Sequence, residues 1–225
     1  MYKRQVIIGI NPKCGCSNII RFFIDISEEN RLLFIKKQTL YYSCEKLPSD
    51  YIKYKIFIII RNPFERLVSG VLNKYYGTYD EEKHGNYIKN FNKSGLVLNF
   101  KNFVNILINY PLGKYIDKHH FMPQLSEYWT DDLLKHPNII FYDINNVNFM
   151  EIQKCFNNDF NDYDTYKVIK KNPVIIKDAH LIEIPKLTKS INYNCLYTKE
   201  LKQYVYNYYK NDFDIFKILG FNYDI

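Results

Sequence analysis

Apolar residues gather along this chain in short continuous runs, and the first two stop at turn-forming residues. Gln5–Ile10 ends at Asn11-Pro12, and Lys55–Ile60 ends at Arg61-Asn62-Pro63. A third run, Asn138–Tyr142, is similar in length. Runs of this kind are typical of strands buried on both faces of a parallel sheet.

Between these runs, apolar positions recur at helical spacing. Asn62 and Pro63 supply the cap and the first turn of one predicted helix, and Asn99 caps another. Segments 147–156 and 198–210 also have helical patterns. Strands that alternate with helices predict an α/β fold, in which helices flank a central parallel β-sheet.

No repeat or low-complexity linker divides the 225 residues, so we expect a single domain over residues 1–225. One stretch lacks any periodicity. Gly77–Gly95 is mostly polar, and we expect residues 77–97 to form a surface loop over the active site.

Charge and cysteine content narrow the class of protein. The net charge of +7 favours an anionic ligand, but no dense Lys/Arg run or zinc-finger spacing indicates nucleic acid. Five scattered cysteines disfavour a disulfide framework. No signal peptide pattern is present, and no run approaches the roughly 20 apolar residues that span a bilayer. We therefore expect a soluble, cytoplasmic protein without a membrane anchor.

The first candidate site is NPKCGCSNIIR, residues 11–21, where a predicted strand turns into a helix. Such a corner points free backbone N–H groups at an anion. Lys13 adds positive charge, Gly15 allows close approach and Ser17 offers a hydroxyl and a cap. The Walker A order fails here, and the second strand ends in Arg61 instead of a magnesium-binding carboxylate. A metal-free anion site is favoured, although corners of this type are also common without a ligand.

The predicted helix after the second strand offers another anion site. Asn62, Arg66, Ser69 and Asn73 are spaced four, three and four residues apart, so they share one polar face. Arg61, at the carboxyl end of the strand, and Ser69 can converge on one phosphate. We interpret Arg66 and Asn73 as solvated surface residues.

These motifs resemble those of the PAPS-dependent sulfotransferases, specifically the Golgi carbohydrate sulfotransferases, where PAPS is 3′-phosphoadenosine 5′-phosphosulfate. PKCGCSNIIR is similar to their 5′-phosphosulfate loop P-K-x-[GA]-C-[ST]-N-x-x-[KR], and RNPFERLVSG to their 3′-phosphate motif R-[DN]-P-[FY]-x-R-[LF]-x-S. HFMPQ, residues 120–124, resembles H-[FW]-x-P-Q, and the ending YNYYKNDFDIFKILGF resembles Y-x-x-D-[FY]-x-x-F-[GN]-Y. The resemblance is weakest in the middle of the chain, and the family's usual membrane anchor has no counterpart in this sequence.

The resemblance implies a P-loop-like sulfotransferase fold that moves a sulfuryl group from PAPS to a carbohydrate hydroxyl, in line and without a metal, giving PAP and a sulfated glycan. Lys13 would neutralise the bridging oxygen as PAP leaves. His120 is the implied general base, with His119 as the alternative, and His119 and His84 are expected near the acceptor. The implied PAPS-binding residues are Lys13, Cys14, Gly15, Cys16, Ser17, Asn18, Arg61 and Ser69.

Other functions stay open at this point. The acceptor could be a lipid, a phenol or a protein tyrosine, because the acceptor-binding middle of the chain is the least similar part. A nucleotide kinase would need magnesium and a carboxylate near the phosphate loop. A non-catalytic nucleotide-binding protein would bind PAP without turnover.

Overall fold

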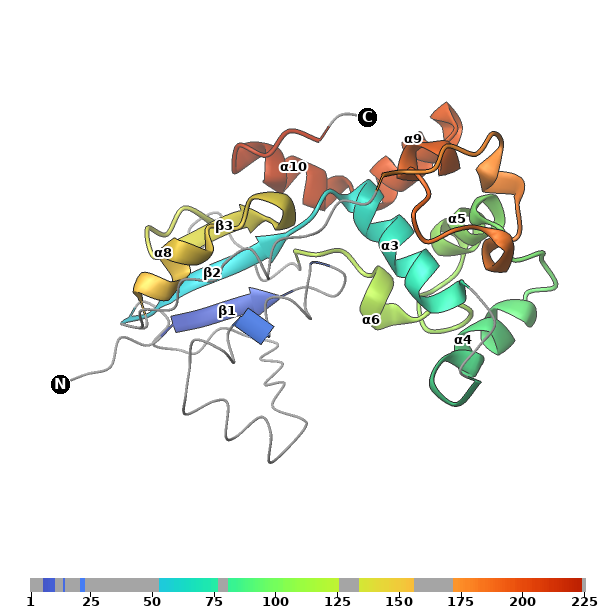
Figure 1. Ribbon diagram of the computed structural model, residues 1–225, viewed down its shortest axis with the longest axis horizontal. Helices are drawn as coiled ribbons and strands as arrows, with labels where there is room; N and C mark the ends of the chain where they lie inside the picture. The colour runs from blue at the N-terminus through green and yellow to red at the C-terminus, as the bar shows by residue number, and fades with distance from the viewer. Residues whose placement is uncertain are drawn as a thin grey trace. The chain divides into compact units, whose positions relative to one another are not determined.

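The chain folds as two compact units. The first comprises Met1–Arg61 and Leu125–Ile169, and the second comprises Asn62–Gln124 and Lys170–Ile225. The strands belong to the first unit and most of the helices to the second (Figure 1). The computed structural model describes residues 6–10, 14, 21–22, 53–76, 81–125, 134–155 and 172–223.

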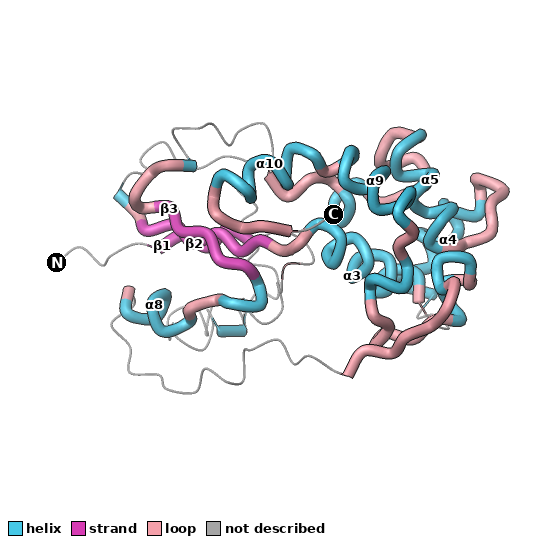
Figure 2. The backbone as a smooth tube through the Cα atoms, turned by 90° about the horizontal axis from the view of Figure 1, so that it is seen from above, coloured by secondary structure: helices cyan, strands magenta, loops and turns pink. Residues whose placement is uncertain are grey.

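The first unit contains a parallel three-stranded sheet in the order β1-β2-β3, whose strands are drawn in magenta in Figure 2. The strands are β1 (Val6–Ile10), β2 (Lys55–Ile60) and β3 (Ile139–Asp143). Phe57 of β2 pairs with Ile8 of β1 on one side and with Ile140 of β3 on the other. All three predicted strands are thus present to within one residue at each end, and a parallel sheet accompanied by helices agrees with an α/β fold.

Burial of β2 explains why it reads as a continuous apolar run. Its last five residues are at most 3% exposed, as a central strand with both faces covered requires. Phe57 and Ile59 share an apolar cluster with residues of α8 (Phe149–Lys154), which follows β3 through the 3₁₀ turn η2 (Ile144–Asn146). The helix predicted over 147–156 is confirmed in a slightly shorter form.

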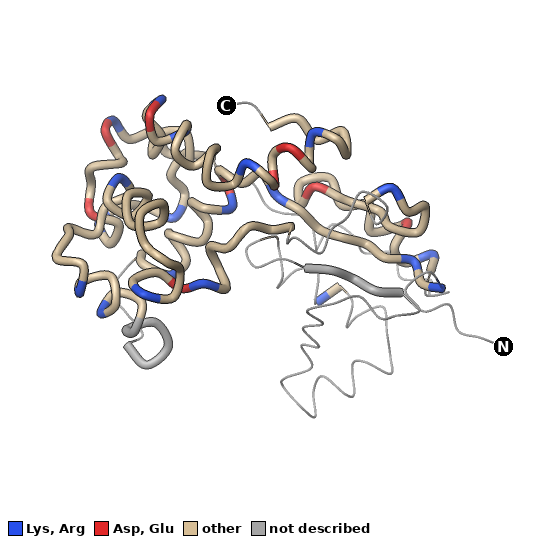
Figure 3. Tube along the Cα trace, turned by 180° about the vertical axis from the view of Figure 1, so that it is seen from behind, with Lys and Arg blue, Asp and Glu red and all other residues tan. Residues whose placement is uncertain are grey.

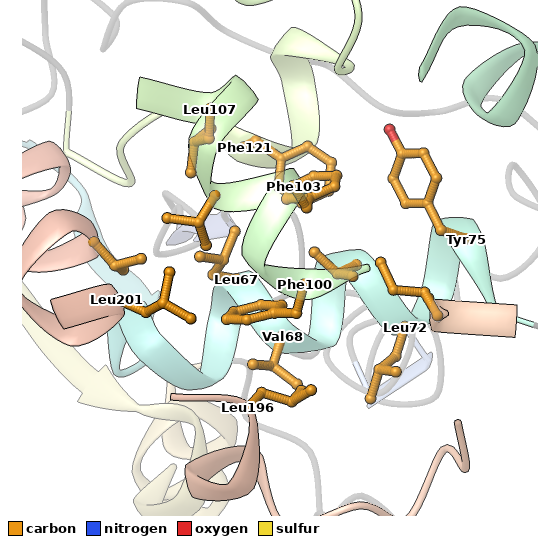
Figure 4. Packing of buried hydrophobic residues seen from close by; sticks show 14 of the residues in the cluster. Leu67, Val68, Leu72, Tyr75, Phe100, Phe103, Leu107, Phe121, Leu196 and Leu201 are labelled. Carbon is orange, nitrogen blue, oxygen red and sulfur yellow. The ribbon is translucent and has the colours of Figure 1, made fainter. Parts of the chain in front are cut away.

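The second unit is built from helices around one apolar core. Asn62, Asn99 and Thr198 cap three of these helices with side-chain oxygens that accept backbone N–H groups, as the sequence predicted for the first two. Phe100 and Phe103 from one helix share this core with Leu67 and Val68 from another (Figure 4). The helices are α3 (Pro63–Tyr75), α4 (Glu81–Asn92), α5 (Phe100–Asn109), α6 (Lys118–Phe121), α9 (Lys199–Tyr208) and α10 (Lys210–Ile218).

Three short 3₁₀ turns lie between residue 172 and the start of α9. They are η4 (Ala179–Leu181), η5 (Ile184–Lys186) and η6 (Tyr193–Leu196). Ala179, Ile184 and Leu196 are fully buried in the core of the second unit, so each turn is fixed by one apolar side chain.

The expectation of a surface loop over residues 77–97 is wrong for its central part, because Glu81–Asn92 form the helix α4. Only the last turns of α4 have apolar residues at helical spacing. Among these, Phe91 is fully buried and its ring stacks parallel to that of Phe103 at 6.1 Å between centroids. Tertiary contact at one end therefore stabilises a helix whose polar start has no amphipathic pattern.

Charged positions occur along the described trace of both units (Figure 3). Two exposed ion pairs, Lys186–Glu183 and Lys210–Asp214, join neighbouring turns of the second unit. Exposed pairs of this kind add little to stability, because water and salt screen their charges. Within the described ranges, no helix combines the length and the apolar content that crossing a membrane requires.

Candidate functional site

The two predicted anion motifs begin at the ends of adjacent strands. β1 ends at Ile10, directly before the first motif, and Arg61 follows the last residue of β2 and is partly buried. Cys14 is fully buried in the apolar cluster of the first unit, so its side chain acts there as a packing group. The rest of the predicted phosphosulfate loop lies outside the described residues, namely Lys13, Gly15, Cys16, Ser17 and Asn18.

Helix α3 carries the polar face that was predicted to hold a phosphate. Ser69 is partly buried on this helix and Asn73 is exposed. Arg66, however, is only 1% exposed, so its interpretation as a solvated residue is wrong. Its Nη1 donates a hydrogen bond of 2.8 Å to the backbone oxygen of Met122. Helical spacing identifies a polar face, but it cannot show whether that face meets water or the backbone of another segment.

His120 lies on the short helix α6 and is held by Asp117, the N-cap of that helix. Oδ2 of Asp117 accepts a hydrogen bond of 2.9 Å from the backbone N–H of His120, and it also forms a hydrogen bond with the ring Nδ1 of His120. The two side chains are 18% and 20% exposed. A carboxylate on Nδ1 favours the tautomer with the proton on Nδ1, which leaves the lone pair on Nε2. The pair is therefore arranged like a base and its orienting acid.

Tyr87 and Lys74 lie next to this pair. The ring of Tyr87 meets that of His120 edge to face, with centroids 6.4 Å apart, and Lys74 Nζ lies 5.2 Å from the centre of the Tyr87 ring. Partial burial lowers the pKa of Lys74, while the charge of Asp117 opposes this shift. Burial, and then Asp117, raises the pKa of the Tyr87 hydroxyl. Asp117 is therefore an electrostatic neighbour of both groups as well as a partner of the imidazole.

The other two histidines predicted near the acceptor occupy different positions. His119 is exposed, and its ring centroid lies 5.3 Å from that of His120. Of these two neighbours, His120 is the one with the hydrogen bond to Asp117. His84 belongs to α4, the helix of Tyr87, and its side chain lies outside the described residues.

Asp117, Tyr87 and Lys74 were not singled out from the sequence. The signal for Asp117 was an acidic residue three positions before His120, which is the spacing of an N-cap to the third residue of its helix. A helix of four residues has no periodicity that would reveal this cap. Tyr87 and Lys74 meet His120 through tertiary packing, which spacing alone does not show.

Comparison with known families identifies the class of protein. The model of the sulfotransferase family matches residues 3–218. The chain therefore belongs to the sulfotransferase family, and the resemblance carried by its motifs is confirmed. No curated protein and no solved structure matches the chain. Sulfuryl transfer is accordingly the general activity of this family member.

Proposed function

We propose that the protein transfers the sulfuryl group of PAPS to a hydroxyl of a carbohydrate and releases PAP. Family membership supports sulfuryl transfer in general. The observation that carries the finer proposal is the hydrogen bond between Asp117 and His120, because transfer to a neutral hydroxyl requires a base to remove its proton. The P-loop-like fold with helices flanking the sheet belongs to the same proposal.

The donor would be bound by the two motifs at the strand ends. In the first, Lys13 and the backbone around Gly15 and Ser17 bind the 5′-phosphosulfate, with Cys14, Cys16 and Asn18 completing the turn. In the second, Arg61 and Ser69 bind the 3′-phosphate that distinguishes PAPS from ATP. The buried state of Cys14 is compatible with this assignment, since its side chain packs in the apolar cluster and takes no space from a ligand.

The proposed reaction forms one bond and breaks one. The acceptor oxygen bonds to sulfur while the bond from sulfur to the 5′-phosphate oxygen breaks, in line. Nε2 of His120 takes the hydroxyl proton, and Asp117 stabilises the imidazolium that results. Lys13 neutralises the charge that develops on the leaving oxygen.

A sugar acceptor is supported by the surroundings of His120. Tyr87 offers a flat apolar ring and a hydroxyl beside the base, and Lys74 adds a positive charge above that ring. Sugars present both C–H faces and hydroxyls, so this combination suits them. We place the acceptor beside His120, with His119 and with His84 of α4 near it. A lipid, a phenol or a protein tyrosine is the alternative acceptor.

The donor site is tested by calorimetric titration with PAP in buffer without magnesium. We expect wild type to bind PAP, and Arg61→Ala and Ser69→Ala to weaken binding by about 10- to 100-fold, because each loses a hydrogen bond to a charged phosphate. Lys55→Ala and Asn73→Ala are matched controls, since both side chains are exposed on the same strand or helix. They should bind PAP as wild type does.

Two results of this titration would change the assignment. Binding of ATP that depends on magnesium, with no binding of PAP, would replace the sulfotransferase proposal with a kinase. Tight PAP binding without transfer of label from PAPS to any glycan, lipid, phenol or tyrosine peptide would indicate a nucleotide-binding protein without turnover.

A further inference from the structure

The backbone that follows His120 is held by three side chains that lie far from it in the sequence. The hydroxyl of Tyr209 donates to the carbonyl oxygen of Phe121 at 2.7 Å, and Arg66 Nη1 donates to that of Met122 at 2.8 Å. The backbone N–H of Gln124 donates to Oδ2 of Asp212, also at 2.8 Å. The backbone groups of Phe121, Met122 and Gln124 are thus bound by side chains from the end of α9, from α3 and from α10, respectively.

All three holding side chains are buried. Arg66 and Tyr209 are each 1% exposed, and Asp212 is 0% exposed. Hydrogen bonds in such surroundings are stronger than at the surface, and losing one leaves a backbone group without a partner away from water. The three bonds therefore restrict this segment more tightly than exposed contacts would.

Helix α6 depends on bonds of this kind. It has four residues, far fewer than an isolated helix needs for stability, and the carbonyl groups at the end of a helix have no partner inside it. Phe121, its last residue, supplies one of the bound carbonyls and also places its ring in the core, 5.0 Å from that of Phe103 (Figure 4). The end of α6 is thus fixed by its carbonyl and by its side chain.

We propose that Arg66, Tyr209 and Asp212 are positioning residues for His120, which act by holding the backbone of residues 121–124. The proposal rests on the role of His120 as the base. Tyr209 and Asp212 stand at the tyrosine and aspartate of the Y-x-x-D ending, and Arg66 stands inside the RNPFERLVSG motif. The proposal thus assigns these motif residues to the positioning of the base and not to the binding of the donor phosphates.

The link from this segment to the imidazole is short. Asp117 binds both the backbone N–H and the ring of His120, so the ring bond forms only while α6 keeps its turn. The carbonyl of Phe121, one residue further, is held by Tyr209. When that bond is lost, α6 can unwind from its end, and His120 then moves away from the carboxylate.

The test compares Tyr209→Phe with Tyr197→Phe by ¹⁵N NMR of the histidine rings. Each change removes one hydroxyl that donates to a backbone oxygen in the second unit, that of Phe121 or that of Phe64. His120→Gln identifies the His120 signals among the five histidines. In wild type we expect distinct Nδ1 and Nε2 shifts for His120, as for a ring fixed with its proton on Nδ1.

In Tyr209→Phe we expect the two His120 shifts to move toward the averaged values of the exposed His119, while Tyr197→Phe keeps them as in wild type. Unchanged His120 shifts in a folded Tyr209→Phe protein would overturn the proposal. So would equal changes in both variants, since these would indicate a general loss of stability. The His120 shifts are measured without donor or acceptor. If PAP fails to bind, the proposed function is contradicted, but the effect of Tyr209→Phe on the His120 ring is still tested.

Discussion

At the scale of single residues, Asp117 decides which nitrogen of His120 is available. We expect Asp117→Asn to lower kcat for sulfuryl transfer by about 10²- to 10⁴-fold, because an amide can donate to Nδ1 and so favour the wrong tautomer. Affinity for PAP should stay unchanged. The measurement is transfer of ³⁵S from labelled PAPS to a panel of glycan acceptors.

The neighbouring histidine gives the control for this experiment. His119→Ala should retain most of the activity, whereas His120→Ala should lose as much as Asp117→Asn or more, since the exposed ring of His119 has no described bond to Asp117. If His119→Ala were the inactive variant, the base would have to be reassigned by one position.

The same residues show what a sequence can and cannot tell at this scale. His120 was named as the candidate base from the motif HFMPQ, and Arg61 and Ser69 from the spacing after a strand. Asp117 and Arg66 needed the structure, because their partners are a ring three residues away and a backbone oxygen 56 residues away. A motif identifies residue types at fixed spacing, but not the atoms that they bind.

At the scale of elements, α3 and α6 approach each other at a glycine. A Cβ placed on Gly70 would lie 2.7 Å from Cε1 of Phe121. That ring is fully buried against Phe103, so it cannot move aside without a rearrangement of the core. We expect Gly70→Ala to lower the free energy of unfolding by about 1–3 kcal/mol, in spite of the better helix propensity of alanine.

Urea unfolding followed by circular dichroism measures this change. Lys101→Ala, an exposed substitution on α5, which packs in the same core, is the control and should be neutral or slightly stabilising. A Gly70→Ala protein as stable as wild type would mean that the contact between α3 and the Phe121 ring is looser than described.

Elements with a strong local signal could be predicted from the sequence, and those that depend on distant partners could not. β2 and the caps at Asn62 and Asn99 are encoded locally, by an apolar run and by residue types that accept backbone N–H groups. α4 and α6 are not encoded locally. α4 is anchored by the ring of Phe91, and α6 by hydrogen bonds from α3, α9 and α10 to the backbone at its end.

At the scale of the whole molecule, one buried and two partly buried tyrosines make stability depend on alkaline pH. Burial raises the pKa of Tyr208 to about 12 and raises those of Tyr197 and Tyr209 well above the usual 10. The unfolded chain therefore releases these protons near pH 10 while the folded protein retains them. The contribution of these raised pKa values to stability is fully present below pH 10 and is lost as the pH rises toward the folded-state pKa values.

Urea unfolding at pH 8, 9.5 and 11, or about these values, measures this dependence. Tyr209→Phe should reduce the slope above pH 10, and Tyr110→Phe, which changes an exposed tyrosine, should leave it as in wild type. The same slope in all three proteins would show that Tyr209 ionises in the folded state as easily as in the unfolded one.

The division into two units was beyond what the sequence could predict. Among the described residues, the chain passes between them at Arg61–Asn62 and at Gln124–Leu125, inside one motif and directly after another. Pro63 and Pro123 lie beside these positions, but each belongs to a short motif and not to an extended glycine- and proline-rich linker, so no boundary is visible in the pattern. The α/β class followed from the alternation of strands and helices, but the grouping of elements followed from their tertiary contacts.

The bonds that hold residues 121–124 all end on main-chain atoms, and this has a consequence for evolution. Every amino acid provides the carbonyl that Arg66 binds at Met122, so the side chain at that position can change while the bond persists. If His120 is the base, as proposed, a substitution at Met122 would alter the surroundings of the base while Arg66, Tyr209 and Asp212 still hold the backbone. The side chain at this position and the support of the base would then be free to evolve almost independently.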